Sequence, residues 1–286
     1  MLSKSTLLGS VLILLGAANH PPFFAEAEEV YFNDGGKYNT SQTYPSHNIF
    51  VMNGTTLSLV EGHLVTAPPD GKSGEDAIRV EDSTFYAKSG SIYGGLGVGG
   101  SGVTVTTNRN SGFQGKAVFE AGVEVYGGDA IRQTTTKGGD AVQILHDGSE
   151  ALFNGGVFTP GAGCSIQVCG QPTSDGNSLQ VLYGKAIIMG GDFTGNFYSE
   201  KGTIEVHGCV KFNGEKITGV LSDGSNIDVT FSGGENDVSV VYSDSTCPPS
   251  TETETETPNN KAVQDYSAKF VVFTSLVMGY FITSFN

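Results

Sequence analysis

Two adjacent carboxylates, Glu75 and Asp76, are the residues of this 286-residue sequence whose types and spacing best suit acid–base chemistry. Glycoside hydrolysis requires two carboxyl groups that act in concert, one donating a proton and the other activating water or attacking the sugar. A polysaccharide lyase would instead need a basic residue beside acids that hold calcium, and Arg79 follows closely. The acidic pair therefore directs attention to carbohydrate chemistry.

The phrase that contains Asp76 is repeated along the chain, which favours a structural role for it. Gly-Asp-Ala followed by an aliphatic residue returns at 128–131 and at 139–142. Aspartate in a tight turn accepts hydrogen bonds from backbone N–H groups, while the alanine and the aliphatic residue can enter a core. We therefore predict that Asp76, Asp129 and Asp140 are turn residues rather than catalysts. Arg79 and Arg132 each follow an Ala-Ile pair and are expected to share one face.

Short strands must position these residues, because residues 47–242 repeat one theme. An alternating apolar run, a small or acidic break, a second alternating run and a pair of glycines return several times. Strand-only repeats of this kind are typical of a β-solenoid, in which alternate residues stack into one interior and glycines turn the corners. A tandem antiparallel β-sandwich is the alternative. Strands are expected to start at Ile49, Ile78, Val103, Ala130, Val142 and Gln180, and the side chains expected to point inward are Ile78, Val80, Phe85, Val142, Ile144, Phe153, Leu182, Ile187 and Ile204.

The repeated theme resembles the right-handed parallel β-helix of the pectin-lyase-like superfamily, in which such phrases run "apolar run, Asp-Gly-Ser, apolar run, Gly-Gly-x-Phe". The resemblance covers residues 47–242. It implies an all-β, single-domain, right-handed parallel β-helix. Residues 73–78, Ser-Gly-Glu-Asp-Ala-Ile, resemble the S-G-D-D-[AC]-I motif of the polygalacturonases, with Glu in place of the first Asp. The resemblance implies that Glu75 and Asp76 take the positions of the catalytic acids and that His207, with Gly208, stands for the catalytic histidine.

The formal net charge of −15 limits the partners and cofactors of the protein. A nucleic-acid partner is not expected, because phosphate binding requires a basic surface. The histidines are scattered without the spacing of a zinc site. No cofactor is predicted; Ca²⁺ held by outward Asp and Glu side chains is the alternative, although no EF-hand and no G-G-x-G-x-D run occurs.

Both ends of the chain carry processing signals. Residues 1–27 combine Lys4, a short apolar run and small residues, as a secretory signal peptide does, with cleavage after Ala18 or Ala27. A disordered Thr/Glu/Pro-rich stalk at 243–260 precedes the hydrophobic tail 261–286. The tail is typical of a GPI-attachment signal with Asn260 as the attachment residue; a single-pass membrane anchor is the alternative. Residues 28–46 are then expected to cap the β-helix.

These signals predict a glycoprotein on the extracellular face of the plasma membrane. Asn39 and Asn53 begin N-glycosylation sequons. Disulfides are expected in an oxidising compartment, and three pairings are possible, of which one would join Cys164 to Cys169 and Cys209 to Cys247.

Two classes of function remain open. One is a non-enzymatic cell-surface protein, structural or adhesive, which presents an acidic face to cell-wall or extracellular glycans. The other is a divergent carbohydrate-active enzyme, similar to a polygalacturonase or a polysaccharide lyase. A groove that holds carboxylates about 5–9.5 Å apart would favour the enzyme. Acids spread evenly over a smooth solenoid would favour the surface protein, which is the function we expect.

Overall fold

The computed structural model describes residues 28–242 apart from 46, 61–62, 66–73, 97–98, 109–110, 131–136, 166–168, 170–171 and 235–236. The chain divides into two compact units, and all described residues belong to the first, Met1–Pro248. The predicted signal peptide, stalk and tail lie outside the described residues, as do Arg132, Cys247 and Asn260. No helix in the described part of the chain is long and apolar enough to cross a membrane.

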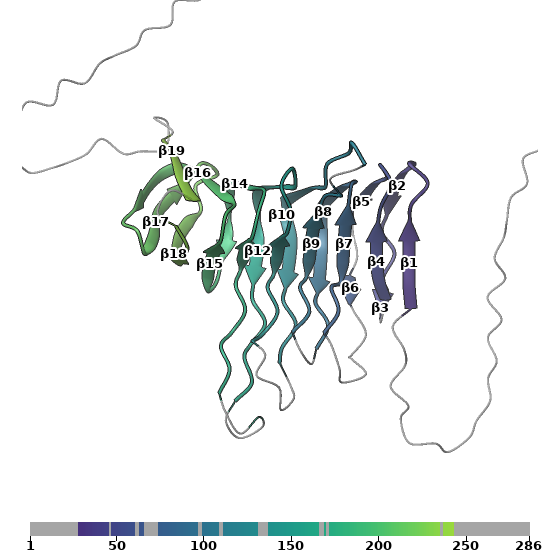
Figure 1. Ribbon diagram of the computed structural model, residues 1–286, viewed down its shortest axis with the longest axis horizontal. Coiled ribbons are helices and arrows are strands. Elements are labelled where there is room, and N and C mark those ends of the chain that lie inside the picture. Colours follow the sequence, from purple (N-terminus) through teal and green to yellow (C-terminus); the bar gives the residue numbers. More distant parts are fainter. Residues whose placement is uncertain are drawn as a thin grey trace, which may run out of the picture. The chain divides into compact units, whose positions relative to one another are not determined.

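Of the nineteen strands in the described residues, all but β17 stack into three parallel rows, which form the three faces of a β-solenoid (Figure 1). Face A consists of β1 (Glu28–Phe32), β4 (His47–Val51), β7 (Ile78–Glu81), β9 (Val103–Thr106), β11 (Val142–Ile144), β13 (Leu179–Val181), β15 (Asn196–Ser199) and β18 (Asn226–Ser232). Face B consists of β2 (Lys37–Thr40), β5 (Thr56–Leu59), the first halves of β8 (Thr84–Tyr93), β10 (Lys116–Tyr126), β12 (Glu150–Thr159) and β14 (Lys185–Phe193), then β16 (Thr203–Phe212) and β19 (Val238–Tyr242). Face C consists of β3 (Tyr44–Pro45), β6 (His63–Val65) and the second halves of the long strands.

The parallel pairing confirms the predicted β-solenoid and excludes the antiparallel sandwich. Four of the expected strand starts lie in register on face A: Ile49, Ile78, Val103 and Val142. The spacing along this ladder is 29, 25 and 39 residues. Ala130 is not a strand start on face A, because it lies between the end of β10 and the start of β11. The coils differ in length because loops leave the stacked strands at the corners.

The interior is filled by residues that alternate along most strands, as the period-2 pattern predicts, whereas all four residues of β9 are buried. Phenylalanine rings form its centre, with centroids 5.1 Å apart for Phe119 and Phe153 and 4.8 Å apart for Phe158 and Phe193. Most of the side chains expected to point inward are buried, but Leu182 and Ile187 are only partly buried. Their neighbours fill the core instead: Val181, Ala186 and Ile188 are buried.

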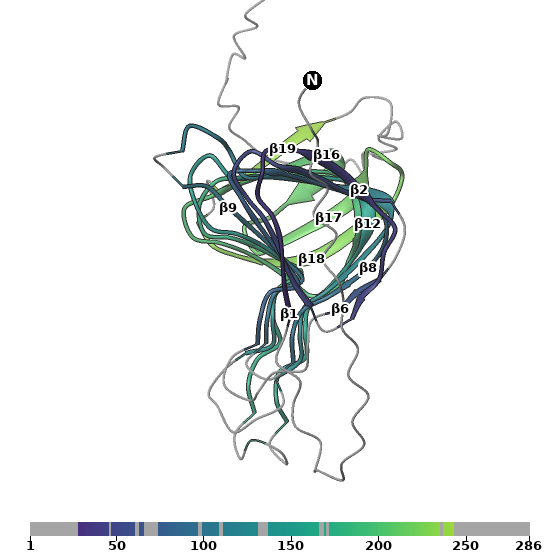
Figure 2. The ribbon, with the colours of Figure 1, turned by 90° about the vertical axis from the view of Figure 1, so that its right-hand side faces the viewer.

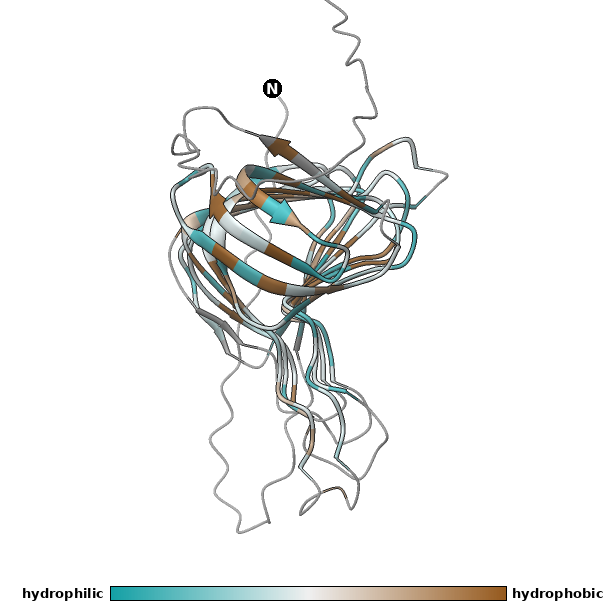
Figure 3. Cartoon of the chain, turned by 90° about the vertical axis from the view of Figure 1, so that its left-hand side faces the viewer, coloured by the Kyte–Doolittle hydropathy of each residue, from teal (hydrophilic) through white to brown (hydrophobic). Residues whose placement is uncertain are grey.

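The two ends of the solenoid are built differently. Residues 28–45, in the segment expected to act as a cap, contribute β1, β2 and β3, which continue all three faces. At the other end, β16 turns into an antiparallel ribbon with β17 (Lys216–Leu221) and β18. Figure 3 looks onto this end and shows polar and hydrophobic residues alternating along the ribbon. The inward residues of this ribbon, such as Ile217 and Val229, cover the last coil.

A glycine-rich projection leaves the solenoid between faces C and A (Figure 2). We call the described residues of 94–102, 127–141 and 160–178 the glycine arm. Outgoing and returning segments of successive coils join through N–H···O hydrogen bonds of 2.8–3.0 Å, which connect Gly95, Gly100, Gly128, Gly139, Gly161 and Gly176 in that order. A Cβ atom on Gly139 would lie 2.0 Å from the carbonyl oxygen of Gly100. The arm therefore requires glycine because its backbones touch.

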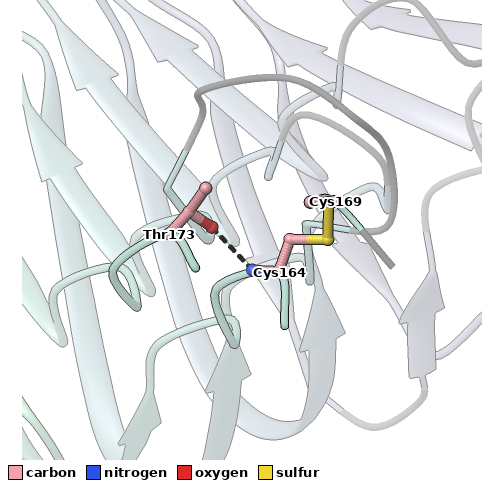
Figure 4. Close-up of a disulfide and its surroundings, with 3 residues drawn as sticks. All are labelled: Cys164, Cys169 and Thr173. Carbon is pink, nitrogen blue, oxygen red and sulfur yellow. Dashed lines mark hydrogen bonds between the residues drawn. A yellow bond between two sulfur atoms is a disulfide. The ribbon is translucent and has the colours of Figure 1, made fainter. Parts of the chain in front are cut away.

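One disulfide lies in the glycine arm and joins Cys164 to Cys169, which confirms that local pairing (Figure 4). The backbone N–H of Cys164 also donates to Thr173 Oγ1 at 2.6 Å. Cys209 is disulfide-bonded as well, and its partner lies outside the described residues. Because the first pair is local, the first two cysteines fasten one loop rather than joining distant coils.

Candidate functional site

A groove on the outer side of face A is the candidate functional site. It consists of two clefts of about 630 and 250 Å³, and Arg79 lines both of them. The larger cleft is lined by Arg79, Glu81, Thr106, Thr107, Asn108, His146 and Tyr183. The smaller is lined by Glu29, Asn48, Phe50, Gly74, Glu75, Asp76 and Arg79.

Strand alternation and coil register bring these residues together. On β7, Arg79 and Glu81 point outward because Ile78 and Val80 fill the core. Glu81 is in register with Thr106 of the next coil. His146 and Tyr183 follow β11 and β13 in the two coils after that. The larger cleft is therefore assembled from four successive coils of one face.

The larger cleft offers hydrogen-bond donors and acceptors around an aromatic ring. Thr106 Oγ1 and His146 Nδ1 are 2.7 Å apart, which fixes the orientation of the imidazole. Arg79 Nε lies 3.9 Å from Glu81 Oε2, which is longer than a hydrogen bond. The Lys201 ammonium lies 5.6 Å from the ring centroid of Tyr183. Such a lining suits a ligand that is rich in hydroxyl groups.

The smaller cleft contains the acidic pair Glu75 and Asp76. Asp76 Oδ1 accepts the backbone N–H of Ser101 at 3.1 Å. Burial raises the pKa of Asp76 above its ordinary value, and this effect outweighs the opposite influence of the Thr104 hydroxyl, the Ser101 N–H and Arg79. Asp76 therefore holds its proton to a higher pH than an exposed aspartate does.

An amide and an aromatic pair form the other side of the smaller cleft. Asn48 is 4% exposed, and its Oδ1 makes no hydrogen bond to the described residues. Phe50 stacks on Tyr31 of the first coil, with ring centroids 4.8 Å apart. Glu29 belongs to the same coil as Tyr31. The first coil thus contributes to the groove.

The three aspartates of the repeated phrase all accept a backbone N–H from another coil. Besides Asp76, Asp129 Oδ1 accepts from Ala162 at 2.7 Å, and Asp140 Oδ1 accepts from Asn177 at 2.7 Å. Asp140 also forms an ion pair with Lys137 at 3.0 Å. These contacts connect stacked coils, although none of the three aspartates lies in a turn. Asp129 lies in the segment that follows β10, whereas Asp76 and Asp140 lie just before β7 and β11, so the repeated phrase occupies two different structural positions.

His207, the histidine implied by the family resemblance, lies on face B rather than in the groove. Its Nε2 is 2.5 Å from Glu205 Oε1, and Lys185 Nζ is 2.6 Å from Glu205 Oε2. Lys185, followed by His207, lowers the pKa of the Glu205 carboxyl. The structure therefore brings Glu75 and Asp76 together with Arg79, but places His207 on a different face.

The remaining predicted sites are distributed over the surface. Asn39 is exposed on β2, and Asn53 is exposed in a turn where its φ is 57°. Within the described residues, no three His, Cys, Asp or Glu side chains converge as a metal site would require. Arg132, expected to share a face with Arg79, lies outside the described residues.

Sequence reasoning missed the residues of the larger cleft other than Arg79. Thr106, Asn108, His146 and Tyr183 belong to no motif, and 77 residues separate the first from the last. The signal that could have found them is the register of the strands that pair in order with the strand at Ile78. That register places equivalent positions of successive coils side by side.

Comparison with known protein families, with curated proteins and with solved structures gives no match for this chain. The class of the protein is thus defined by its fold and its site: a parallel β-solenoid with a polar groove along one face.

Proposed function

We propose that the protein is a non-enzymatic β-solenoid of the cell surface that binds extracellular glycans through the groove on face A. The observation that carries this proposal is the lining of the larger cleft. It combines a guanidinium, an imidazole, an amide and hydroxyl groups around Tyr183, a set that matches the hydroxyl groups and apolar ring faces of a saccharide. Among the described residues, Glu81 supplies the carboxylate of this cleft, while Glu29, Glu75 and Asp76 line the smaller cleft of the groove.

Binding to a carbohydrate array, followed by titration of the best ligand, tests this function. Arg79→Ala and Tyr183→Ala should each weaken binding about tenfold or more, because each removes a side chain that lines the larger cleft. Asp192→Ala is the matched control, since Asp192 is exposed on β14 away from the groove. An array without any ligand would contradict the proposal, as would binding that Arg79→Ala leaves unchanged.

A divergent carbohydrate-active enzyme related to the pectin-lyase-like superfamily is the second candidate. The observation in its favour is the smaller cleft, which Asp76 lines together with Glu75 and Arg79. Burial also raises the pKa of Asp76, as a general acid requires. Release of reducing ends from pectic or other acidic glycans, abolished by Asp76→Asn, would establish this candidate in place of the first. A purified protein that binds a glycan and leaves it intact would exclude it for that glycan.

The location at the outer face of the plasma membrane is part of the same proposal. It rests on the predicted signal peptide, on the stalk and tail around Asn260, and on oxidised Cys164 and Cys169, which fit an oxidising compartment. Treatment of intact cells with phosphatidylinositol-specific phospholipase C should release the protein. Mass spectrometry of the mature C-terminal peptide provides the check, because recovery of residues 270–285 would rule out GPI attachment.

A further inference from the structure

Four large side chains form an apolar ladder on the outer side of face B. Tyr86, Val118, Leu152 and Ile187 lie in register on β8, β10, β12 and β14. They point outward because the residues on either side of each one are buried. Tyr86 is 37% exposed, and Leu152 and Ile187 are partly exposed, whereas Val118 lies beneath its neighbours at 5%. Figure 2 shows β8 and β12 along the same side of the solenoid.

The apolar ladder has a polar boundary at each end and a charged ladder beside it. On the strand next to β8, Ser58 of β5 is in register with Tyr86. On the strand next to β14, Glu205 of β16 is in register with Ile187. In the adjoining ladder, Lys116, Glu150 and Lys185 alternate in charge along the axis of the solenoid. Lys116 Nζ is 2.7 Å from Glu150 Oε1. Face B is therefore close to electrical neutrality in this region, although the chain as a whole carries −15.

The order of these residues is self-complementary. Consider a two-fold axis that is parallel to the strands and passes between β10 and β12. It places β12 of a second copy opposite β10 of the first, and β10 of the second copy opposite β12 of the first. Lys116 then faces Glu150 of the partner subunit, and Glu150 faces the partner's Lys116. Val118 likewise faces the partner's Leu152. An isologous interface needs this reciprocity: if residue i of one copy contacts residue j of the other, then residue j of the first copy contacts residue i of the second.

We propose that the outer side of face B is a dimer interface and that its partner is a second copy of this chain. The pairing buries the apolar ladder against itself at the usual separation of packed sheets, about 10 Å. It also brings two strongly acidic molecules together at a neutral surface, where like charges do not oppose contact. The interface is narrow, so the dimer is weaker than a permanent one and forms in the micromolar range.

Sedimentation equilibrium of the purified protein, at concentrations up to about 100 μM, tests the inference. Wild type should reach twice the monomer mass. Leu152→Lys places a charge at the centre of both copies and should raise the dissociation constant about 30-fold or more, as the loss of a central interface residue does. Ser232→Lys adds the same charge at an exposed site on β18 of face A and should leave the dimer intact. A wild type that stays monomeric throughout this range would overturn the proposal, as would a dimer that Leu152→Lys does not weaken.

Charge reversal provides a second test that does not depend on the apolar residues. Lys116→Glu and Glu150→Lys should each weaken the dimer, since each places like charges opposite one another across the two-fold axis. The double variant restores opposite charges and should recover dimerisation, while the thermal unfolding of each monomer verifies folding. A double variant that dimerises no better than the single variants would contradict the proposed register of the interface.

Discussion

The glycine arm is expected to be the part of the molecule that is most sensitive to a single added methyl group. In Gly139→Ala, the new Cβ would lie 2.0 Å from the carbonyl oxygen of Gly100, where a carbon–oxygen contact normally needs about 3.3 Å. One segment must therefore move by more than about 1 Å. The atoms in the way belong to the backbone, so no side-chain rotation can relieve the contact.

The magnitude follows from the hydrogen bonds that such a movement breaks. Gly139 N donates to Gly128 O, Gly161 N donates to Gly139 O, and Gly128 N donates to Gly100 O, each at 2.8 Å. These glycines are buried, and each bond contributes about 1 kcal/mol, with a further penalty for any group left without a partner. We expect Gly139→Ala to lower the free energy of unfolding by about 3–5 kcal/mol.

Equilibrium unfolding in urea measures this loss, and Gly112→Ala is the control. A Cβ at Gly112 meets no atom within 4 Å, but its φ of +73° is unfavourable for alanine, so the expected loss is about 1–2 kcal/mol. If Gly139→Ala unfolds at the same urea concentration as wild type, the backbones of the arm are not packed as described.

Further predictions concern two carboxyl groups and the core. The raised pKa of Asp76 means that its contribution to stability is present at low pH and is lost as pH rises through the folded pKa, so Asp76→Asn should be more stable than wild type at neutral pH. Glu205 has a lowered pKa, so its contribution is present at neutral pH and is lost as pH falls through the folded pKa; Glu205→Gln should destabilise at pH 7 and converge with wild type in acid. Urea midpoints measured between pH 3 and pH 8 check both signs, and parallel curves would refute them. Phe153→Ala should cost about 3–5 kcal/mol, because that ring is fully buried against three other phenylalanines, and a shift in urea midpoint below a third of this would show a looser core.

The sequence predicted the strands and most of the interior because period-2 alternation is a local signal. The prediction that Leu182 and Ile187 point inward is wrong, because apolar residues there occupy both the inward and the outward positions of the alternation. Val181 and Leu182 are adjacent aliphatic residues, and Ile187 has Ile188 beside it. The pairing of Ile187 with Leu152 on the outer side of face B shows that Ile187 points outward and Ile188 inward, and this pairing cannot be read from the local sequence.

The glycine arm could not be predicted from the same patterns. Glycine has no side chain that could show periodicity, and the sequence pattern predicts only corners at the glycines of the arm. Ala130, expected to start a strand, lies in this arm because the coil that contains it is 39 residues long rather than about 25. The contacts that shape the arm join backbone atoms of different coils, and no local residue preference records them.

The candidate site was predictable only where it is local. Glu75 and Asp76 lie within one local motif, and Arg79 follows that motif directly in the sequence. His146 and Tyr183 join Arg79 only through coil register, and the unequal coil lengths concealed that register in the sequence.

Hydrogen–deuterium exchange with a ligand selected from the array tests most directly whether the groove on face A binds glycans. Bound glycan should slow exchange in the segments around Arg79, Asn108, His146 and Tyr183, which line the larger cleft. Face B and the antiparallel ribbon at the C-terminal end should be unaffected. Protection confined to face B or to that ribbon, with none in the segments of the groove, would contradict the account.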